Sequence, residues 1–166
     1  MTGPVLVAYA SKYGSTREVA EAIAAMLRER LLRVVVSPSD EVDDLGEYSG
    51  VVLGGGIYMG RWHRDARRFI KHFENDLRGV PVALFALGPT DDDPEHRAGS
   101  EKQFASMLEK VPCEPVATAL FGGAIDPRKL SFPFNHMPAA DVRDWDEIRA
   151  WAADVADVFP SVPALA

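Results

Sequence analysis

Residues 4–32 read PVLVAYASKYGSTREVAEAIAAMLRERLL, and this stretch decides the fold. The apolar run from Pro4 to Ala10 has the length and composition of a buried strand. A polar turn with one glycine, Ser11 to Ser15, follows at once. From Thr16 to Leu32, apolar residues recur at three- and four-residue steps, which predicts an amphipathic helix. A strand, a short turn and a helix in this order form the first half of a βαβ unit.

The rest of the chain repeats this alternation. Further strands are predicted at 34–36, 51–56, 81–87 and 116–121, and helices at 62–77, 100–109 and from Asp144 onward. We expect a loop at 88–99 and no regular element at 126–142. The pattern predicts an α/β fold, a doubly wound five-stranded parallel sheet of order 2-1-3-4-5 with helices on both faces. We expect one domain over residues 1–160 and a short tail at 161–166.

Composition excludes several classes of protein. The 25 acidic and 18 basic residues give a net charge of −7, which argues against a nucleic-acid-binding protein. The basic cluster at 61–71 is expected to be a solvated helix face. A lone cysteine, Cys113, excludes an internal disulfide and a cysteine metal site, and it fits a reducing cytoplasm. We see neither a signal peptide nor an apolar run near the ~20 residues of a membrane span, and we expect a cytoplasmic protein.

The turn after the first strand predicts an anion site. Its residues are Ser11, Lys12, Tyr13, Gly14, Ser15 and Thr16. A helix start leaves backbone N–H groups unpaired and carries a partial positive charge, so it attracts phosphate. We expect a cradle of mainly neutral donors, with Lys12 as a possible extra charge. The alternative is an ordinary N-cap, because serine and threonine are common capping residues. Neither the Walker signature nor the dinucleotide signature occurs in the chain.

This part of the chain resembles the flavodoxin signature, which binds the phosphate of FMN. The matching residues are Val7, Tyr9, Ser11, Gly14, Thr16, Ala20 and Ile23. Ala8 departs from the signature, because a larger apolar residue is usual there. Other segments resemble the menaquinone-dependent protoporphyrinogen dehydrogenase branch of the family. These are 51–54 with Ile57, Gly60 and His63, then 69–71, 122–126 and 143–146. The resemblance covers most of the chain and implies a flavodoxin-like fold with FMN as cofactor.

Two departures separate the chain from that branch. Residues 54–60 read GGGIYMG, whereas the enzymes that act on protoporphyrinogen resemble Gly-x-Ser-Ile-Arg-Tyr-Gly at this loop. Residues 127–142 also stand in place of a longer basic, aromatic segment that is associated with the membrane. We therefore carry over flavin binding but neither the porphyrin substrate nor membrane docking.

The resemblance also implies that the FMN ring lies against the loops after the third and fourth strands. The expected contacts are Gly56, Ile57, Tyr58, Met59 and Gly60, then Leu87, Gly88, Pro89 and Thr90. We expect glycines 54–56 to allow close backbone approach, and Tyr58 or Met59 to pack on the ring. His63 is expected on the substrate side of the flavin, with a surface position at a helix end as the alternative. Trp62 matches the buried stripe of its helix and is expected in the core.

Together these features predict an FMN-dependent oxidoreductase that passes electrons to a quinone-like or protein acceptor, with no catalytic side chain and no metal. The alternatives are a non-enzymatic electron shuttle that docks to redox partners through its acidic surface, and a protoporphyrinogen dehydrogenase. The acidic triplet 91–93 is expected to be a solvated loop or a docking patch, and the histidines lack metal-ligand spacing. A receiver-like module is excluded, because glycines 54–56 stand where that class needs an aspartate. The oligomeric state stays open.

Overall fold

The structure is a computed structural model that describes residues 3–11, 13–30 and 32–159, except for the side chain of residue 134. Its strands are β1 Val5–Ala10, β2 Val34–Pro38, β3 Gly50–Tyr58, β4 Arg61–Trp62, β5 Val82–Leu87, β6 Ala117–Phe121, β7 Ala124–Ile125 and β8 Ala140–Asp141. Its α-helices are α1 Ser15–Glu29, α2 Arg64–His72, α3 Pro94–Leu108 and α4 Trp145–Val158. Short 3-10 helices are η1 Ser39–Glu41, η2 Asp76–Gly79, η3 Pro127–Lys129 and η4 Phe134–His136. Lys12, Leu31 and the tail at 161–166 lie outside the described residues.

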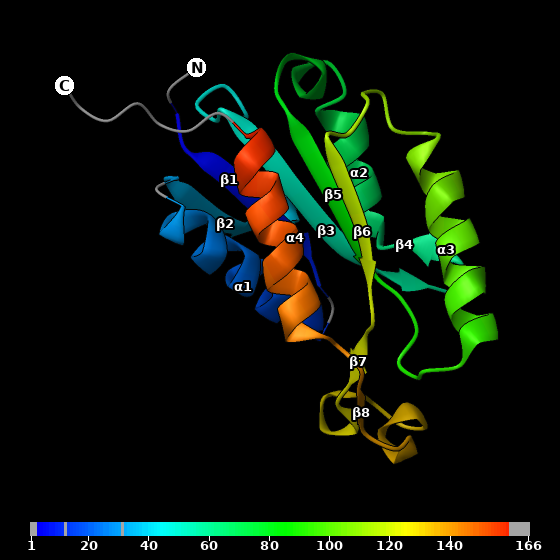
Figure 1. Cartoon of the computed structure of the whole chain (residues 1–166). Coiled ribbons are helices and arrows are strands. Elements are labelled where there is room, and N and C mark those ends of the chain that lie inside the picture. Colours follow the sequence, from blue (N-terminus) through cyan, green and yellow to red (C-terminus); the bar gives the residue numbers. More distant parts are fainter. Residues whose placement is uncertain (1–2, 12, 31, 160–166) are drawn as a thin grey trace.

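The main sheet confirms the predicted fold class. Its strand order is β2-β1-β3-β5-β6, and all of these neighbours are parallel (Figure 1). β1 is flanked on both sides, so that Leu6 pairs with Val35 of β2 and with Val51 of β3. The strand order is the predicted 2-1-3-4-5, once the short β4, which pairs antiparallel with the end of β3, is set aside. The carboxyl ends of the five strands therefore share one edge of the sheet.

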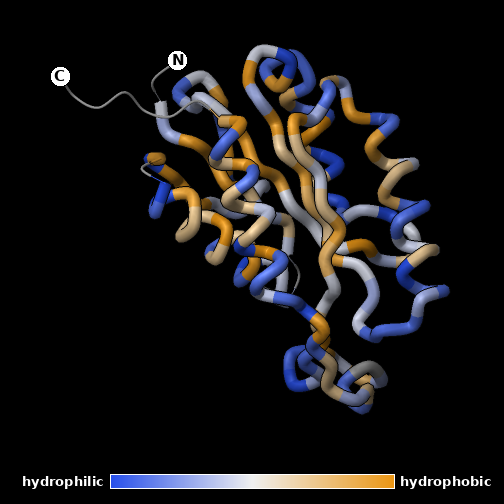
Figure 2. The backbone as a smooth tube through the Cα atoms, viewed as in Figure 1, coloured by the Kyte–Doolittle hydropathy of each residue, from blue (hydrophilic) through white to orange (hydrophobic). Residues whose placement is uncertain are grey.

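Helices cover both faces of the sheet, as predicted. α1 and α4 pack together on one face, and α2 and α3 lie on the other (Figure 1). Successive side chains of β1 point to opposite faces of the sheet. Val5 and Val7 pack with α1 and α4, while Leu6 and Ala8 pack toward α2. The strands carry apolar residues along much of their length, and the helices turn their polar sides outward (Figure 2). Burial on both faces explains the unbroken apolar run at 82–87.

Glycine is required at positions 54 and 55 because neighbouring protein side chains occupy the space that a Cβ would need. A Cβ on Gly54 would lie 1.9 Å from Cζ of Phe85, and one on Gly55 would lie 3.0 Å from Nε1 of Trp62. The Trp62 indole N–H donates to the carbonyl of Gly55 over 2.9 Å, and Trp62 is 3% exposed. Trp62 is therefore in the core, as predicted, but the helix expected at 62–77 was wrong. Trp62 lies on β4, α2 covers only Arg64–His72, and the separate 3-10 helix η2 follows at Asp76–Gly79. Close approach at these two glycines is to protein side chains.

Two expectations about the loops were wrong. α3 begins at Pro94 rather than at Ser100, because the Asp93 carboxylate caps it by accepting from the Glu95 N–H over 2.8 Å. Proline at the first helical position fits this start, since its missing N–H has no partner to lose there. Residues 126–142, expected to be irregular, lie largely within an excursion of defined structure between β6 and α4. Its base is the antiparallel pair β7–β8, and η3 and η4 lie between them.

The last helix begins where the sequence predicted. Asp144 is the N-cap of α4, and its Oδ1 accepts from the N–H groups of Asp146 and Glu147, each over 3.1 Å. Cys113 is half-buried, and burial raises the pKa of its thiol. In the part of the chain that the structure describes, no helix combines the length and the apolar character needed to cross a membrane.

Candidate functional site

A cleft of about 1670 Å³ opens at the carboxyl ends of the strands. Four segments line it: the β1–α1 turn, the β3–β4 hairpin, the β5–α3 loop and the excursion 124–141, which we call the insert. The expected site residues on its wall are Ser11, Tyr13, Ser15, Gly56, Ile57, Tyr58, Met59, His63, Leu87, Gly88, Pro89 and Thr90. Gly14, Thr16 and Gly60 are not among the lining residues, although each adjoins one of them in the chain, and Lys12 is outside the described residues.

The β1–α1 turn is tight and is closed by a bond to the Ser11 hydroxyl. Gly14 precedes α1 in the left-handed conformation, with φ of 94°, and its N–H donates to Oγ of Ser11 over 2.9 Å. The Gly14 carbonyl accepts from the N–H of Glu18 over 3.1 Å. Among the described residues, no side chain caps α1, so the ordinary N-cap alternative does not explain Ser15 and Thr16, while Ser11 closes the turn through its bond to Gly14.

Among the described residues, two buried side-chain hydroxyls lack a hydrogen-bond partner: Thr16 in this turn and Ser39 in η1. Thr16 is 0% exposed, yet within the described part of the chain its Oγ1 has no hydrogen-bond partner. A buried hydroxyl without a partner costs about 1–3 kcal/mol, and native proteins keep few of them. The turn therefore holds a donor, next to a helix N-terminus, that a phosphate oxygen would satisfy.

The β3–β4 hairpin presents Tyr58 to the cleft. Met59 and Gly60 form its two-residue turn with φ of 49° and 79°, which is the pattern a type I′ turn requires. The Met59 side chain is fully exposed, and a Cβ on Gly60 would face the Gln103 amide at 3.3 Å. The Tyr58 ring folds back over Gly56, where a Cβ would meet its Cε2 at 3.0 Å. Burial, and to a lesser extent Tyr13, raise the pKa of Tyr58, so its phenol stays protonated at neutral pH.

His63 lies both in the cleft and at the end of a helix, the two positions between which the sequence left a choice. It lines the cleft, and it is also the N-cap of α2, because its Nδ1 accepts from the Asp65 N–H over 3.0 Å. Its side chain is 13% exposed, and its ring stands edge-on to Tyr58 with centroids 5.9 Å apart. The bond at Nδ1 fixes the ring orientation beside the Tyr58 wall of the cleft.

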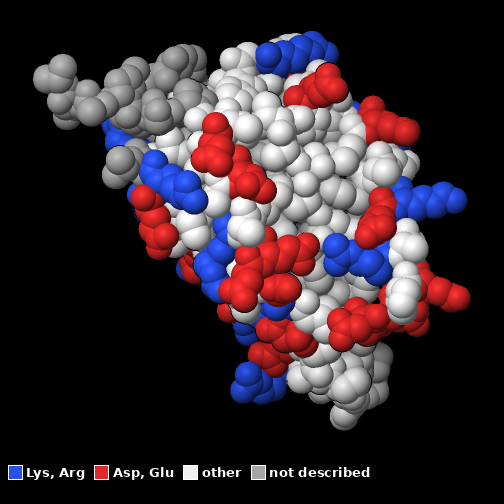
Figure 3. All heavy atoms as spheres, viewed as in Figure 1, with Lys and Arg blue, Asp and Glu red and all other residues white. Residues whose placement is uncertain are grey.

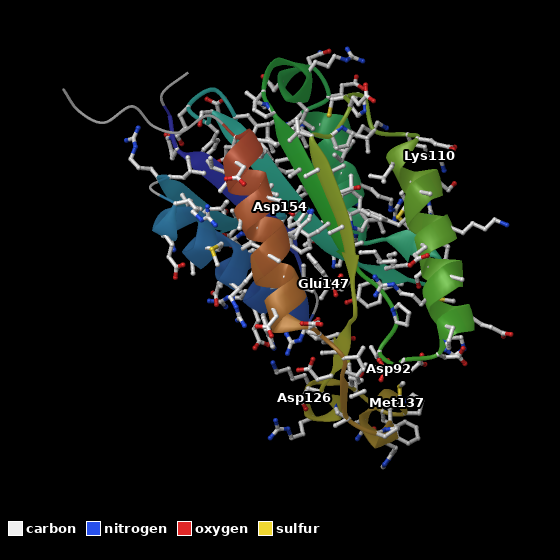
Figure 4. The ribbon with its side chains drawn as sticks, in the orientation of Figure 1. Asp92, Lys110, Asp126, Met137, Glu147 and Asp154 are labelled. Carbon is white, nitrogen blue, oxygen red and sulfur yellow. The ribbon has the colours of Figure 1, made fainter. Side chains whose placement is uncertain are left out.

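The insert forms the wall that the sequence did not predict. Figure 4 shows Asp126 and Met137 on it, below the carboxyl ends of the strands, and both line the cleft. Lys129 reaches from η3 to the β1–α1 turn, where its Nζ donates to the carbonyl of Tyr13 over 3.3 Å. This contact joins residues that are 116 positions apart, so no local pattern in the sequence could indicate it.

Most cations near the turn are already paired with carboxylates. Arg128 meets both oxygens of Asp126 at 3.0 Å and lowers the pKa of that carboxyl. Arg143, whose side chain is 8% exposed, lies 2.7 Å from Asp141, and it also donates to the carbonyl of Ser15 over 3.2 Å. The Asp141 pKa is lowered chiefly by its bond to Arg143. Lys129, in contrast, makes no ion pair within 4.0 Å to any carboxylate in the described segments.

The cleft differs in charge from the rest of the molecule. Six basic and four acidic residues line it, which gives the lining a formal charge of +2. Because the net charge of the whole chain is −7, the residues outside the lining carry −9. The basic cluster at 61–71 is exposed, as predicted, but Arg61, Arg64 and Arg67 also line this cleft. The positive rim is thus built from α2 and its approach on one side and from the insert on the other.

The acidic triplet at 91–93 makes hydrogen bonds within its own loop and with the first turn of α3. The Asp91 carboxylate accepts from the Asp93 N–H over 3.0 Å and lies 2.8 Å from Nδ1 of His96. These contacts lower the pKa of Asp91 and raise that of His96. Asp93 caps α3, as described above. Throughout the described residues, no three His, Cys, Asp or Glu side chains gather as a metal site would need.

Comparison with known proteins gives the family. The model of the flavodoxin domain matches residues 6–137, and the chain belongs to this family, whose cofactor is FMN. Protoporphyrinogen IX dehydrogenase (quinone) of Escherichia coli strain K12 is 25% identical over 123 residues, which cover 72% of this chain and 68% of that protein.

Solved structures agree on the fold. Oxidised Flavodoxin 1 from Bacillus cereus superposes with a TM-score of 0.65 at 17% identity, covering 95% of this chain and 100% of that one. The flavodoxin of Streptococcus pneumoniae TIGR4 gives 0.62 at 18% identity, with 96% and 97% covered. At these identities the likeness establishes the flavodoxin fold alone.

Proposed function

We propose that the chain binds FMN in this cleft and uses it as an electron-transferring enzyme of the cytoplasm. The β1–α1 turn, Ser11 to Thr16 with Lys12 included, holds the phosphate. The observation that carries this proposal is the buried Oγ1 of Thr16, which has no partner in the described chain and sits beside a left-handed Gly14 at the start of α1. A phosphate there satisfies the hydroxyl and the first N–H groups of the helix.

The ring of the cofactor lies between the β3–β4 hairpin and the β5–α3 loop. The residues assigned to it are Gly56, Ile57, Tyr58, Met59 and Gly60, then Leu87, Gly88, Pro89 and Thr90. Tyr58 supplies a flat aromatic wall, and its protonated phenol can donate a hydrogen bond. Bound FMN supplies the redox chemistry, while the protein positions it and controls what reaches it. His63, held by its bond to the Asp65 N–H, faces the substrate side of the ring.

The size and lining of the cleft favour a small, quinone-like electron acceptor. A cleft of about 1670 Å³ exceeds the ~300–1,000 Å³ typical of a site for one small molecule. There is therefore room for an acceptor beside the cofactor. Met59 and Met137 are exposed apolar side chains on its wall, and methionine adapts to flat apolar ligands. The Escherichia coli relative is named for a quinone.

A second candidate, a non-enzymatic shuttle for a basic redox protein, rests on the acidic surface. Figure 3 shows acidic side chains gathered over the N-terminal ends of α3 and α4, close to the insert. The exposed acidic residues there are 91–93 in the loop before α3, Glu95 in its first turn, and Asp146 and Glu147 in the first turn of α4. Such a surface attracts a positively charged partner and speeds its docking.

The two candidates are separated by the rate at which a small quinone oxidises the reduced protein. The protein is loaded with FMN, reduced with dithionite without air, and mixed in a stopped-flow instrument with menadione or with a basic cytochrome c. We expect menadione to oxidise it faster than it oxidises free reduced FMN, with saturation as the quinone concentration rises. Rapid oxidation by the cytochrome alone, with menadione no faster than for free FMN, would instead favour the shuttle.

A matched pair of variants locates the acceptor. Met137→Gln changes an exposed apolar side chain on the cleft wall, and Val158→Gln makes a comparable change at the end of α4, outside the cleft lining. We expect the first variant to raise the half-saturating menadione concentration severalfold and the second to leave it unchanged. Equal behaviour of the two variants would remove Met137 from the acceptor site.

A further inference from the structure

We infer that Lys129 of the insert is a phosphate ligand for FMN, so that the insert itself recognises the phosphorylated form of the flavin. This inference rests on the proposed function, and it adds to it a cation that lies outside the β1–α1 turn. The evidence is the position of Nζ, the absence of a carboxylate within 4.0 Å of it among the described residues, and the ion pairs that already hold Arg128 and Arg143.

The Lys129 ammonium lies directly over the turn. Nζ is 3.3 Å from the carbonyl oxygen of Tyr13 and 3.5 Å from the place where a Cβ on Gly14 would stand. Lys129, Ser11, Tyr13 and Ser15 line the same cleft. An ammonium has three donors, and one bond to Tyr13 leaves others for a phosphate oxygen on the turn. Gly14, having no side chain, keeps the space between Lys129 and the backbone open.

Of Arg128, Lys129 and Arg143, the described cations that the insert and its end bring to this turn, Lys129 is the one with no carboxylate within 4.0 Å. Arg128 is held by both oxygens of Asp126, and Arg143 is held by Asp141 and lies 3.5 Å from Glu18. Each of these guanidinium groups is thus largely neutralised by its partner. Lys129 instead donates to a neutral carbonyl, and its charge makes only the smallest contribution to the lowered pKa of Asp126, after those of Arg128. A phosphate dianion on the turn would offer a far stronger partner.

Lys129 also gives the insert a function. Its η3 turn is built around Asp126, which caps it by accepting from the Arg128 N–H over 3.1 Å, and this places Lys129 at the end of the turn. A bond from Lys129 to the phosphate would tie the insert to the cofactor and hold this wall of the cleft in place. The cradle would then carry a positive charge in addition to the neutral donors that the sequence predicted.

The test compares FMN with riboflavin, which has the same ring but lacks the phosphate. Dissociation constants are measured by quenching of flavin fluorescence in FMN-free protein, for the wild type, Lys129→Gln and Lys110→Gln. Lys110 gives a matched control, because it is an exposed lysine at the far end of α3 and its replacement makes the same change in net charge (Figure 4).

We expect Lys129→Gln to weaken FMN binding about tenfold at pH 8 and to leave riboflavin binding unchanged. The effect should be smaller at pH 5, because phosphate monoesters have a second pKa of about 6 and carry less charge there. Lys129→Arg should restore part of the affinity, and Lys110→Gln should match the wild type for both flavins.

Three results would overturn the inference. An equal loss for FMN and riboflavin would mean that Lys129 only fastens the insert to the Tyr13 carbonyl. Unchanged FMN binding in Lys129→Gln would remove Lys129 from the site while leaving the proposed function intact. A wild-type protein that binds neither flavin would overturn the proposed function and this inference together.

Discussion

Replacing Thr16 by valine should move the stability of the FMN-free protein and its affinity for FMN in opposite directions. Valine keeps the β-branched shape of threonine, so the buried packing and the stiff side chain are retained. What changes is the hydroxyl, whose Oγ1 is buried and has no partner in the described chain. Thr16 is the second residue of α1, and the helix does not use its side chain as a cap.

The role of this hydroxyl sets the size of the change in stability and of the change in FMN affinity. In FMN-free protein the variant removes an unsatisfied polar group, which should raise the free energy of unfolding by about 1 kcal/mol. With FMN bound, the variant loses a hydrogen bond to a charged phosphate, worth about 1.5–3 kcal/mol, so FMN should bind about 10- to 150-fold more weakly. Riboflavin has no phosphate, and its affinity should hardly change.

Urea denaturation of FMN-free protein measures the first quantity, and fluorescence titration with FMN and with riboflavin measures the second. Thr16→Ser is the control, because it keeps the hydroxyl and should keep the preference for FMN over riboflavin. The reasoning fails if Thr16→Val destabilises the FMN-free protein by 1 kcal/mol or more and leaves that preference unchanged, since Thr16 would then be a structural residue only.

Three further substitutions test the geometry. Gly14→Ala forces a side chain into the left-handed region and should destabilise the FMN-free protein by about 1–2 kcal/mol in urea, and an unchanged midpoint would refute the φ of 94°. Gly54→Ala places a Cβ 1.9 Å from the Phe85 ring, so the melting temperature of the variant should fall by several degrees or more. A melting temperature equal to that of the wild type would show that the Phe85 ring moves away at little cost. The His96–Asp91 pair should give His96 an NMR pKa above 6.5 that Asp91→Asn lowers, and its contribution to stability should be full below pH 6.5 and vanish as the pH rises through the raised pKa. A His96 pKa that does not respond to Asp91→Asn would show that the pair does not form in solution.

The fold could be predicted because its signals are local. Strands buried on both faces must be apolar throughout, and the run at 82–87 shows this without any knowledge of its neighbours. Helices beside the sheet repeat apolar residues every three or four positions, as Val19, Ile23 and Leu27 do in α1. Trp62 is buried, but helical periodicity was the wrong reason, because it lies on β4 ahead of the first residue of α2. These features depend on segments of ten to twenty residues, and such segments can be interpreted one at a time.

The start of α3 was missed although its signal is present in the sequence. Asp93-Pro94-Glu95 is a capping aspartate followed by a proline at the first helical position. The charge of the preceding aspartates and the scarcity of apolar residues before Phe104 made the segment resemble a loop. The first turns of α3 bury little, so hydrophobic periodicity could not reveal them.

The insert could not have been predicted from local patterns. Its β7–β8 pairing joins Ala124 to Asp141, and its contact with the turn joins Lys129 to Tyr13. Both depend on where the chain returns in space, and neither has a characteristic spacing. The sequence therefore indicated three of the four segments that line the cleft, and it suggested a nearly neutral phosphate site because the cation on the fourth segment was hidden.

The most direct test of FMN binding in this cleft is a visible absorption spectrum. Purified protein is mixed with excess FMN, desalted and scanned between 300 and 600 nm, beside a variant that combines Ser11→Ala and Thr16→Val. We predict that the wild type retains the yellow flavin bands at close to one flavin per chain, and that the variant, folded by circular dichroism, loses most of them. A wild-type protein that emerges colourless from the column would contradict the assignment of this cleft to FMN.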